Sequence, residues 1–289
     1  MPQAKIFVSN DLGTKEPLDG VDWSRAQNKN YSALHGVASY LAMFCPALPD
    51  YFIKEYSQKE DLVMDNFSGR GTTALVARER RRRFVGSDLN PYAYVLTRFK
   101  ISHLVKAELL ATLAQLRREF EQSKYHNLSL KHQPQLQELR VFYHETTLRQ
   151  LVFLRETYGR HWRRLNPTAN AILALALGLM HGPQRRNNSS IYFSLSMPNT
   201  ISMAPNYVNN YARRHGLTPP EVNIFDLITE RLNQKYDATL LEVPFEGQIY
   251  FHDATQINNA IADNSVKLVV TSPPYLAIVN YTSSNWLKL

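Results

Sequence analysis

The sequence predicts an α/β fold, in which a parallel sheet of about four strands carries a large, mainly helical insertion. Two segments far apart in the chain support this prediction. In the first, the apolar run Leu62–Asp65 leads into the glycine-rich loop Phe67–Thr73. In the second, the apolar run Lys267–Val270 leads into Thr271-Ser272-Pro273-Pro274-Tyr275. Loops at the carboxyl ends of strands bind ligands in open α/β sheets, so both loops are candidate sites.

The N-terminal third predicts an arm followed by half of a nucleotide-binding sheet. Residues 1–30 are polar and lack periodicity, and we expect an N-terminal arm there. Residues 31–104 form the first half of the sheet domain. They contain short helices around Pro46 and Pro49, and then a β-α-β unit with a helix from Thr72 to about Arg82 and a strand at Phe84–Ser87. Pro91 is placed to open the next helix.

The middle of the chain, residues 105–243, predicts a helical insertion. Apolar residues recur at three- and four-residue spacing, which is typical of helices facing a core. The expected helices are Ala107–Tyr125, Gln135–Gly159, Ala169–Met180 and a segment from Pro220 to about Lys235. Residues 244–289 return to the α/β pattern, with strands at Gln248–Phe251 and Lys267–Val270 and a helix from about Asn285.

Composition and charge indicate a globular protein with an anionic partner. The 289 residues carry a formal net charge of +8, which suits a polyanion such as nucleic acid. The dense run Arg78–Arg83 has two interpretations, a solvated helix end or a phosphate contact. The one cysteine, Cys45, excludes an internal disulfide and a cysteine-based metal cluster. No apolar stretch reaches the ~20 residues of a membrane span and no signal peptide is evident, so we expect a cytoplasmic location.

The glycine-rich loop predicts a cofactor site. Gly69 and Gly71 permit a tight turn and the close approach of a ligand, and the helix from Thr72 directs free N–H groups into the same space. Asp88 follows Gly69 by 88 − 69 = 19 residues, at the end of the neighbouring strand. A carboxylate at that place can accept hydrogen bonds from a ribose diol.

A dinucleotide cofactor is the alternative ligand, because Gly69-x-Gly71-x-x-Ala74 also fits a dinucleotide fingerprint. Two details argue against it. Asp65 would repel a pyrophosphate but attract the ammonium group of S-adenosylmethionine, and Thr72 and Thr73 crowd the phosphate position. A tight turn without a ligand is the structural alternative.

The second loop predicts a site for a flat polar base. Pro273 and Pro274 fix the backbone and remove two donors, which leaves carbonyl groups free to accept hydrogen bonds. Ser272 adds a side-chain oxygen and Tyr275 adds a flat face, as an amine on a flipped base requires. No metal or covalent nucleophile is needed. The structural alternative is a Pro-Pro turn with a packed tyrosine.

Together the two loops resemble the DNA amino-methyltransferases of the N4-cytosine/N6-adenine type, over residues of about 31–100 and 245–289. The resemblance implies a Rossmann-like sheet, S-adenosylmethionine as cofactor, and methyl transfer to a flipped base in duplex DNA, as in restriction–modification systems. It implies catalytic roles for Ser272, Pro273, Pro274 and Tyr275. It also implies cofactor contacts from His35, Asp65, Phe67, Ser68, Gly69, Gly71, Thr72, Thr73, Asp88, Asn90 and Asp253. Arg70 departs from the pattern, since a smaller residue is usual there.

The serine form of the second loop is similar to that of many N4-cytosine enzymes, so cytosine N4 is the first expectation and adenine N6 the second. An RNA methyltransferase and a non-catalytic subunit of a split methyltransferase stay as alternatives. The order of the motifs implies that residues 106–240 help to read DNA, although a purely structural helical cap is the competing interpretation. The residues expected to contact DNA are Arg163, Arg164, Arg185, Arg186, Arg213, Arg214, Asn199, Asn206 and Asn209.

The predicted sheet is shorter than the family pattern of seven strands. We therefore expect that the chain is a fragment, or one subunit of a split enzyme that a second polypeptide completes. Alone, it should bind its cofactor weakly and methylate poorly.

Overall fold

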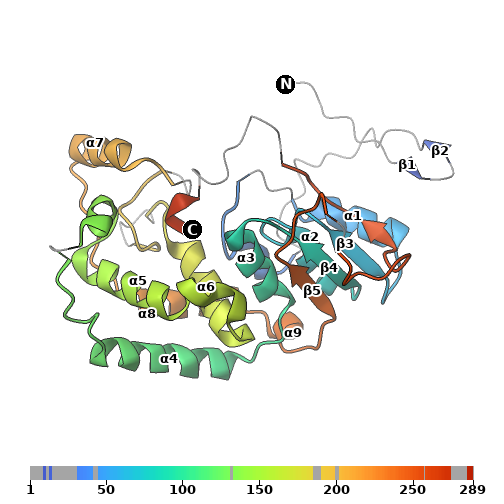
Figure 1. Cartoon of the computed structure of the whole chain (residues 1–289), viewed down its shortest axis with the longest axis horizontal. Helices are drawn as coiled ribbons and strands as arrows, with labels where there is room; N and C mark the ends of the chain where they lie inside the picture. Colours follow the sequence, from blue (N-terminus) through green and yellow to red (C-terminus); the bar gives the residue numbers. More distant parts are fainter. Residues whose placement is uncertain are drawn as a thin grey trace.

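The computed structural model describes residues 9–10, 13–14, 31–41, 45–130, 133–184, 190–198, 202–256, 258–274 and 285–288. Its centre is a sheet of four parallel strands in the spatial order β5-β4-β3-β6 (Figure 1). The strands are β3 (Leu62–Asp65), β4 (Arg83–Ser87), β5 (Gly247–Tyr250) and β6 (Leu268–Val269). The predicted α/β class and the four predicted strands are thus confirmed.

Three helices pack with this sheet. The helix α2 (Thr72–Glu79) connects β3 with β4, α3 (Pro91–Ile101) packs beside β5, and α1 (Ala47–Tyr56) packs on α2. Their apolar side chains close a small core with the strands, made of Ile53, Val63, Ala74, Val76, Ala77, Phe84, Ile101, Ile249 and Val270. Burial of these side chains fixes the strand ends, and with them the loops that follow.

The insertion forms a second and larger core that includes α3. Its elements are α4 (Lys106–Gln122), η5 (Pro134–Val141), α5 (Glu145–Thr157), η6 (Gly159–Arg164), α6 (Pro167–Leu179), α7 (Pro205–His215), α8 (Ile224–Lys235) and α9 (Ala238–Leu241). The almost wholly apolar α6 packs against α3, α4 and α8. Figure 1 shows these helices gathered beside the sheet, with α3 between the two parts. The insertion therefore shares one core with the cofactor half.

Several predicted elements differ from the structure. The single helix expected at 135–159 is wrong: η5 and α5 are separate, because His144 caps α5 through Thr146 N and the Phe142 carbonyl accepts from Leu195 N instead of continuing a helix. The helix α7 was not expected. The helix expected from Asn285 is only the short η7 (Trp286–Lys288). Another short helix, η3 (Ala33–Gly36), precedes α1. Within the arm, β1 (Ser9–Asn10) pairs in antiparallel fashion with β2 (Gly13–Thr14).

Neither interpretation of the basic run holds for Arg78, Arg80 and Arg82, because these arginines bind the protein itself, whereas Arg81 is exposed. Arg78 is buried and donates to the carbonyls of Lys100, Ser102 and Val243. Arg80 binds the Asp50 carboxylate, and Arg82 donates to Ser57. The helix α2 also ends earlier than expected, since Arg81 adopts a left-handed backbone with φ of 57°.

The described part of the chain also shows how β6 is paired and whether a helix could cross a membrane. Among those residues, β6 pairs with β3 alone, and its Val269 is 54% exposed. The described helices include none with the length and apolarity that crossing a membrane requires.

Candidate functional site

The two predicted loops meet where the strand order reverses. Numbered along the chain, the strands of the sheet read third, second, first, fourth, so β4 and β6 lie on opposite sides of β3. Ligands bind at such a point, outside the carboxyl ends of the strands. Here the Thr271 hydroxyl, next to β6, donates to the Asp65 carboxylate at the end of β3, with an O···O distance of 2.7 Å. One hydrogen bond thus joins loops that are 206 residues apart.

Asp65 is a buried anchor for both loops. Its side chain is 1% exposed and accepts from the Phe67 N–H at 3.1 Å. Burial raises the pKa of the Asp65 carboxyl to about 6, although the hydrogen bonds from Thr271 and Thr73 act in the opposite direction. Thr73 also donates to the Val270 carbonyl at 3.3 Å. The expected attraction of Asp65 for a ligand ammonium group stays a prediction.

The glycine-rich loop is held close to the end of β4. Ser68 N donates to the Ser87 carbonyl at 3.1 Å, so the loop extends the sheet by one bond. Gly69 and Gly71 both have positive φ, 51° and 73°. A Cβ on Gly71 would lie 3.0 Å from the Cα of Thr97, so neither the backbone conformation nor the space admits a side chain there.

Asp88 closes the loop from the other side. Its carboxylate accepts from Gly69 N and from Asn90 N, each at 2.8 Å, and burial raises its pKa. Each carboxylate oxygen can accept a further hydrogen bond, which leaves capacity for a ribose diol. Asn90 uses its own oxygen to cap α3 at Tyr92 N.

Sequence reasoning missed Tyr40, which lies over the same loop. Its ring stacks on Tyr92 with centroids 5.7 Å apart, and its hydroxyl accepts from Asn90 Nδ2 at 3.1 Å. Its Cε1 lies 3.5 Å from the position that a Cβ on Gly69 would take. The only signal in the sequence was that Tyr40 falls within the segment 35–52, which resembles the flank of the cofactor site.

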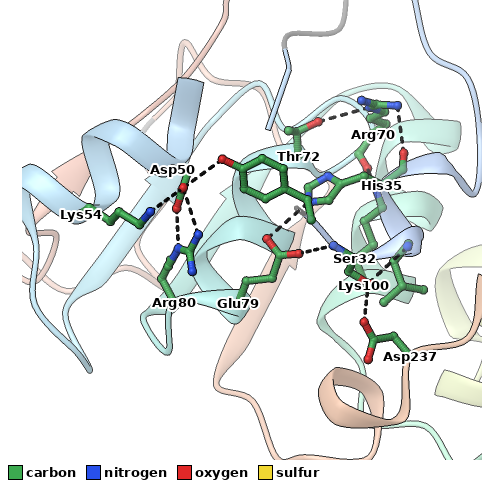
Figure 2. A network of polar contacts seen from close by, with 12 residues as sticks. Ser32, His35, Asp50, Lys54, Arg70, Thr72, Glu79, Arg80, Lys100 and Asp237 are labelled. Carbon is green, nitrogen blue, oxygen red and sulfur yellow. Dashed lines mark hydrogen bonds and ion pairs between the residues drawn. The ribbon is translucent and has the colours of Figure 1, made fainter. Parts of the chain in front are cut away.

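The structure places His35 in a buried polar network behind the loop (Figure 2). Its ring is 2% exposed and its Nε2 lies 3.5 Å from Glu79 Oε2. Burial lowers the pKa of His35 to about 4. Its carbonyl accepts from Arg70 Nη1 at 2.9 Å, and the Arg70 carbonyl accepts from the buried Lys100 at 2.6 Å. Arg70, unusual for the family pattern, therefore ties the loop to the segment that carries Tyr40.

The remaining residues predicted to contact the cofactor differ in burial and in their distance from the cavity described below. Thr72 and Thr73 are buried at the start of α2, and Phe67 is half-buried. Asp253 is used in a turn, where it accepts from the Thr255 N–H and hydroxyl, and these bonds lower the pKa of Asp253. Its neighbours His252 and Ala254 line a cavity that Asp253 itself does not line.

That cavity lies outside the carboxyl ends of β3, β4 and β5 and has a volume of about 290 Å³. Its lining consists of Met64, Asn66, Ser87, His252, Ala254, Gln256, Asn258, Ile261, Ala262, Asp263 and Asn264. Within the described part of the chain, Asn66 Oδ1 and Asn258 Nδ2 are buried without a hydrogen-bond partner. Polar side chains make up much of the lining, as expected of a site for a polar ligand. The residues present therefore fit a nucleoside-containing cofactor, with the glycine-rich loop beside it.

The second loop is only partly described. Thr271 and Ser272 are half-buried, and Pro273 and Pro274 are exposed. Tyr275 lies outside the described residues. The proposed base site can therefore be followed only to Pro274.

The residues expected to contact DNA lie on two separate elements. Arg163 and Arg164 are exposed on η6, and the Arg163 guanidinium lies 4.2 Å from the ring centroid of Phe251, directly after β5. Arg213, Arg214, Asn206 and Asn209 are on α7. Arg185, Arg186 and Asn199 lie outside the described residues. No group of three or more possible metal ligands gathers in the described ranges.

Comparison with known proteins gives one family match and partial matches to curated relatives. Residues 6–98 match a family described as DNA methylase, of the N6/N4 type. The type II methyltransferase M.MjaII of Methanocaldococcus jannaschii is 28% identical over 103 residues, 34% of this chain and 19% of that protein. The type II methyltransferase M.PvuII of Proteus hauseri is 31% identical over 96 residues, which cover 32% of this chain and 29% of that protein. The type II methyltransferase M1.MboII of Moraxella bovis is 34% identical over 76 residues, which cover 25% of this chain and 29% of that protein.

The matched segments thus span less than a third of the length of these curated relatives. The family match contains the glycine-rich loop and Asp88, and together with the three relatives it confirms the resemblance on which the sequence-based prediction depends. They give no support to the expected completing polypeptide.

Proposed function

We propose, on the premise that residues 6–98 belong to the DNA methylase family of the N6/N4 type, that this chain methylates an exocyclic amine of a base in duplex DNA. S-adenosylmethionine is the cofactor on which this family depends, as the sequence predicts. The observation that carries the proposal is the hydrogen bond from Thr271 to Asp65. It brings the residues that precede Ser272-Pro273-Pro274 to the edge of the glycine-rich loop.

The cofactor half of the site would act through binding and orientation. When bound, S-adenosylmethionine supplies the methyl group as a sulfonium electrophile. Asp88 has acceptor capacity for a ribose diol, and the polar residues that line the cavity, among them Asn66 and Asn258, would offer donors and acceptors to an adenine ring. Tyr40 covers Gly69 and would limit the entry of water.

The catalytic half would act by positioning an amine. The Ser272 oxygen and the free carbonyl groups of the proline pair accept the two N–H bonds of the base amine, which fixes the direction of its lone pair. The new N–C bond forms as the methyl group leaves sulfur, and the surplus proton passes from the nitrogen to solvent. Tyr275 would stack on the flipped base. Because positioning supplies most of the rate gain, neither a metal nor a covalent intermediate is needed.

Cytosine N4 is the proposed acceptor and adenine N6 the second candidate. Ser272 in the first position of the loop favours cytosine, by resemblance to the serine-containing enzymes. The alternatives of an RNA substrate and of a non-catalytic subunit make different predictions for the same assay.

The test is transfer of a tritiated methyl group from S-adenosylmethionine to duplex DNA, with structured RNA as competitor. Mass spectrometry of the hydrolysed product distinguishes N4-methylcytosine from N6-methyladenine. Ser272→Ala should reduce transfer by roughly 10²-fold while leaving cofactor binding, measured by calorimetry, unchanged. Ser129→Ala, an exposed serine in the insertion, is the matched control. Transfer to RNA alone, or cofactor binding without any transfer, would reject the proposal.

A further inference from the structure

The helix α7 presents a polar face that its packing does not use. It packs on η5 through its buried residues Val208 and Ala212. Figure 1 shows α7 at the outer end of the insertion, away from the sheet. Of its 11 residues none is acidic, and Arg213, Arg214 and His215 form its last turn. The helix therefore offers a cationic surface to an anionic partner.

Three side chains share the face opposite the packed one. An α-helix turns by about 100° per residue, so Asn206, Asn210 and Arg213 project within about 60° of one another. The same geometry directs Val208 and Ala212 to the other side of the helix. All three polar side chains are exposed. Asn209, which the sequence favoured, lies at the margin of this face and is half-buried.

The chemistry of this face matches the edges of base pairs. Asparagine pairs in bidentate fashion with adenine, and arginine with guanine, in the major groove. A helix of 11 residues is about 16 Å long, and the major groove of about 12 Å width admits it. The deep and narrow major groove of duplex RNA does not admit a helix, which favours DNA as the occupant.

The base of α7 is joined to the segment that follows the second loop. Trp286 Nε1 donates to the Met203 carbonyl at 3.3 Å, two residues before α7 begins. The Trp286 ring meets Phe142 edge-on, with centroids 5.6 Å apart. The N-terminal end of α7 is thus fixed to the described residues 285–288.

We propose that α7 is the element that reads the DNA sequence, with Asn206, Asn210 and Arg213 contacting base edges in the major groove. The inference rests on the proposed function, because it takes duplex DNA as the substrate. It goes further by assigning specificity to one helix face and by adding Asn210, which the sequence did not single out.

The test selects bound duplexes from a pool with a random central segment and sequences them, using the full chain at fixed salt. The wild-type chain should enrich a defined motif. Asn210→Ala should lose discrimination at one base pair, by roughly 5- to 150-fold, while the other positions of the motif stay unchanged. Arg213→Ala should do the same at a different position. Asn233→Ala on α8 and Arg118→Ala on α4 are matched controls at exposed helical positions.

The inference is overturned by the absence of an enriched motif for the wild-type chain, by an unchanged motif in both α7 variants, or by an effect of these variants on RNA binding alone. A uniform loss of affinity without a change in motif would also reject it, because that result indicates a phosphate contact. Binding selection needs no methyl transfer. A chain that selects a motif through α7 but fails the tritium assay would reject the proposed activity and keep the recognition helix.

Discussion

Replacing Asp65 by Asn removes a buried negative charge and keeps the shape of the side chain. The amide oxygen can accept from Phe67 N and from the Thr271 hydroxyl, as the carboxylate does. The amide NH₂ takes the place of the oxygen that Thr73 approaches, and the Thr73 hydroxyl can accept from it while donating to the Val270 carbonyl. The variant therefore changes the charge at the junction of the two loops and little else.

The magnitude follows from the pKa. Burial raises the pKa of Asp65 from 3.8 to about 6, so the folded protein binds this proton more tightly than the unfolded chain. Between pH 4 and 6 the contribution of Asp65 to stability thus falls as the pH rises, by about 3 kcal/mol in total, and it is level above that range. Asp65→Asn does not titrate. We expect it to gain about 3 kcal/mol over the wild type between pH 4 and pH 7.

His35 contributes a slope of the opposite sign, which is why the difference between variants must be measured. Burial lowers the pKa of His35 from 6.5 to about 4, so the folded protein binds this proton less tightly and stability rises with pH between 4 and 6.5. The two slopes largely cancel in the wild-type profile. Subtracting that profile from the Asp65→Asn profile removes the part due to His35.

The assay is urea unfolding at five pH values between 4 and 8, followed by calorimetry with S-adenosylmethionine at pH 8. We expect a more stable variant that binds the cofactor more weakly, since the charge that attracts its ammonium group is lost. A stability difference that does not depend on pH would refute the reasoning. Unchanged cofactor affinity would show that Asp65 holds the loops without acting on the ligand.

Two further predictions concern the glycine-rich loop. Gly71→Ala should lower the free energy of unfolding, measured in urea, by about 2–3 kcal/mol, because the φ of Gly71 is 73° and the new Cβ meets Thr97. The control Gly216→Ala, with φ of 60° and open space around the new Cβ, should cost about 1 kcal/mol. Equal losses in the two variants would argue against the close contact with Thr97. Lys100→Met should be more stable than the wild type at acidic and neutral pH and should lose that gain as the pH rises toward 10.5, because burial lowers the pKa of Lys100 and the stability that this group contributes rises with pH. A fall in cofactor affinity in the same variant, with Met filling the space, would show that the bond to the Arg70 carbonyl positions the loop.

The sequence predicted those parts of the site that depend on local pattern. The strand at Leu62–Asp65, the glycines after it and the acid at Asp88 are recognisable because an apolar run, a turn and an acidic residue follow one another at short spacing. The parts that it missed depend on contacts between distant segments. Tyr40 contacts Gly69 only because the fold brings them together. Arg78 is buried and donates to carbonyl groups of residues more than 20 positions further along the chain.

The helix α7 was missed for a different reason. Its apolar face consists of two small residues, Val208 and Ala212, among polar and aromatic ones, so the helical period in the sequence is weak. Two buried residues suffice to dock it on η5, and Asn206, Asn210 and Arg213 stay exposed. A weak apolar pattern is therefore what a helix with a free polar face produces.

Burial of ionisable groups around one loop argues that the loop has a function beyond turning the chain. Asp65, His35 and Lys100 all have pKa values shifted toward the neutral form, and each reduces stability at some pH between 4 and 10. A turn that only connects β3 to α2 could be held by apolar packing at lower cost. Asp65 and Lys100 instead hold the backbone of this loop by hydrogen bonds to Phe67 N and to the Arg70 carbonyl, and the His35 backbone carbonyl accepts from the Arg70 side chain. Proteins retain such destabilising groups mainly where a ligand needs a rigid site, which is the role that we propose for this loop.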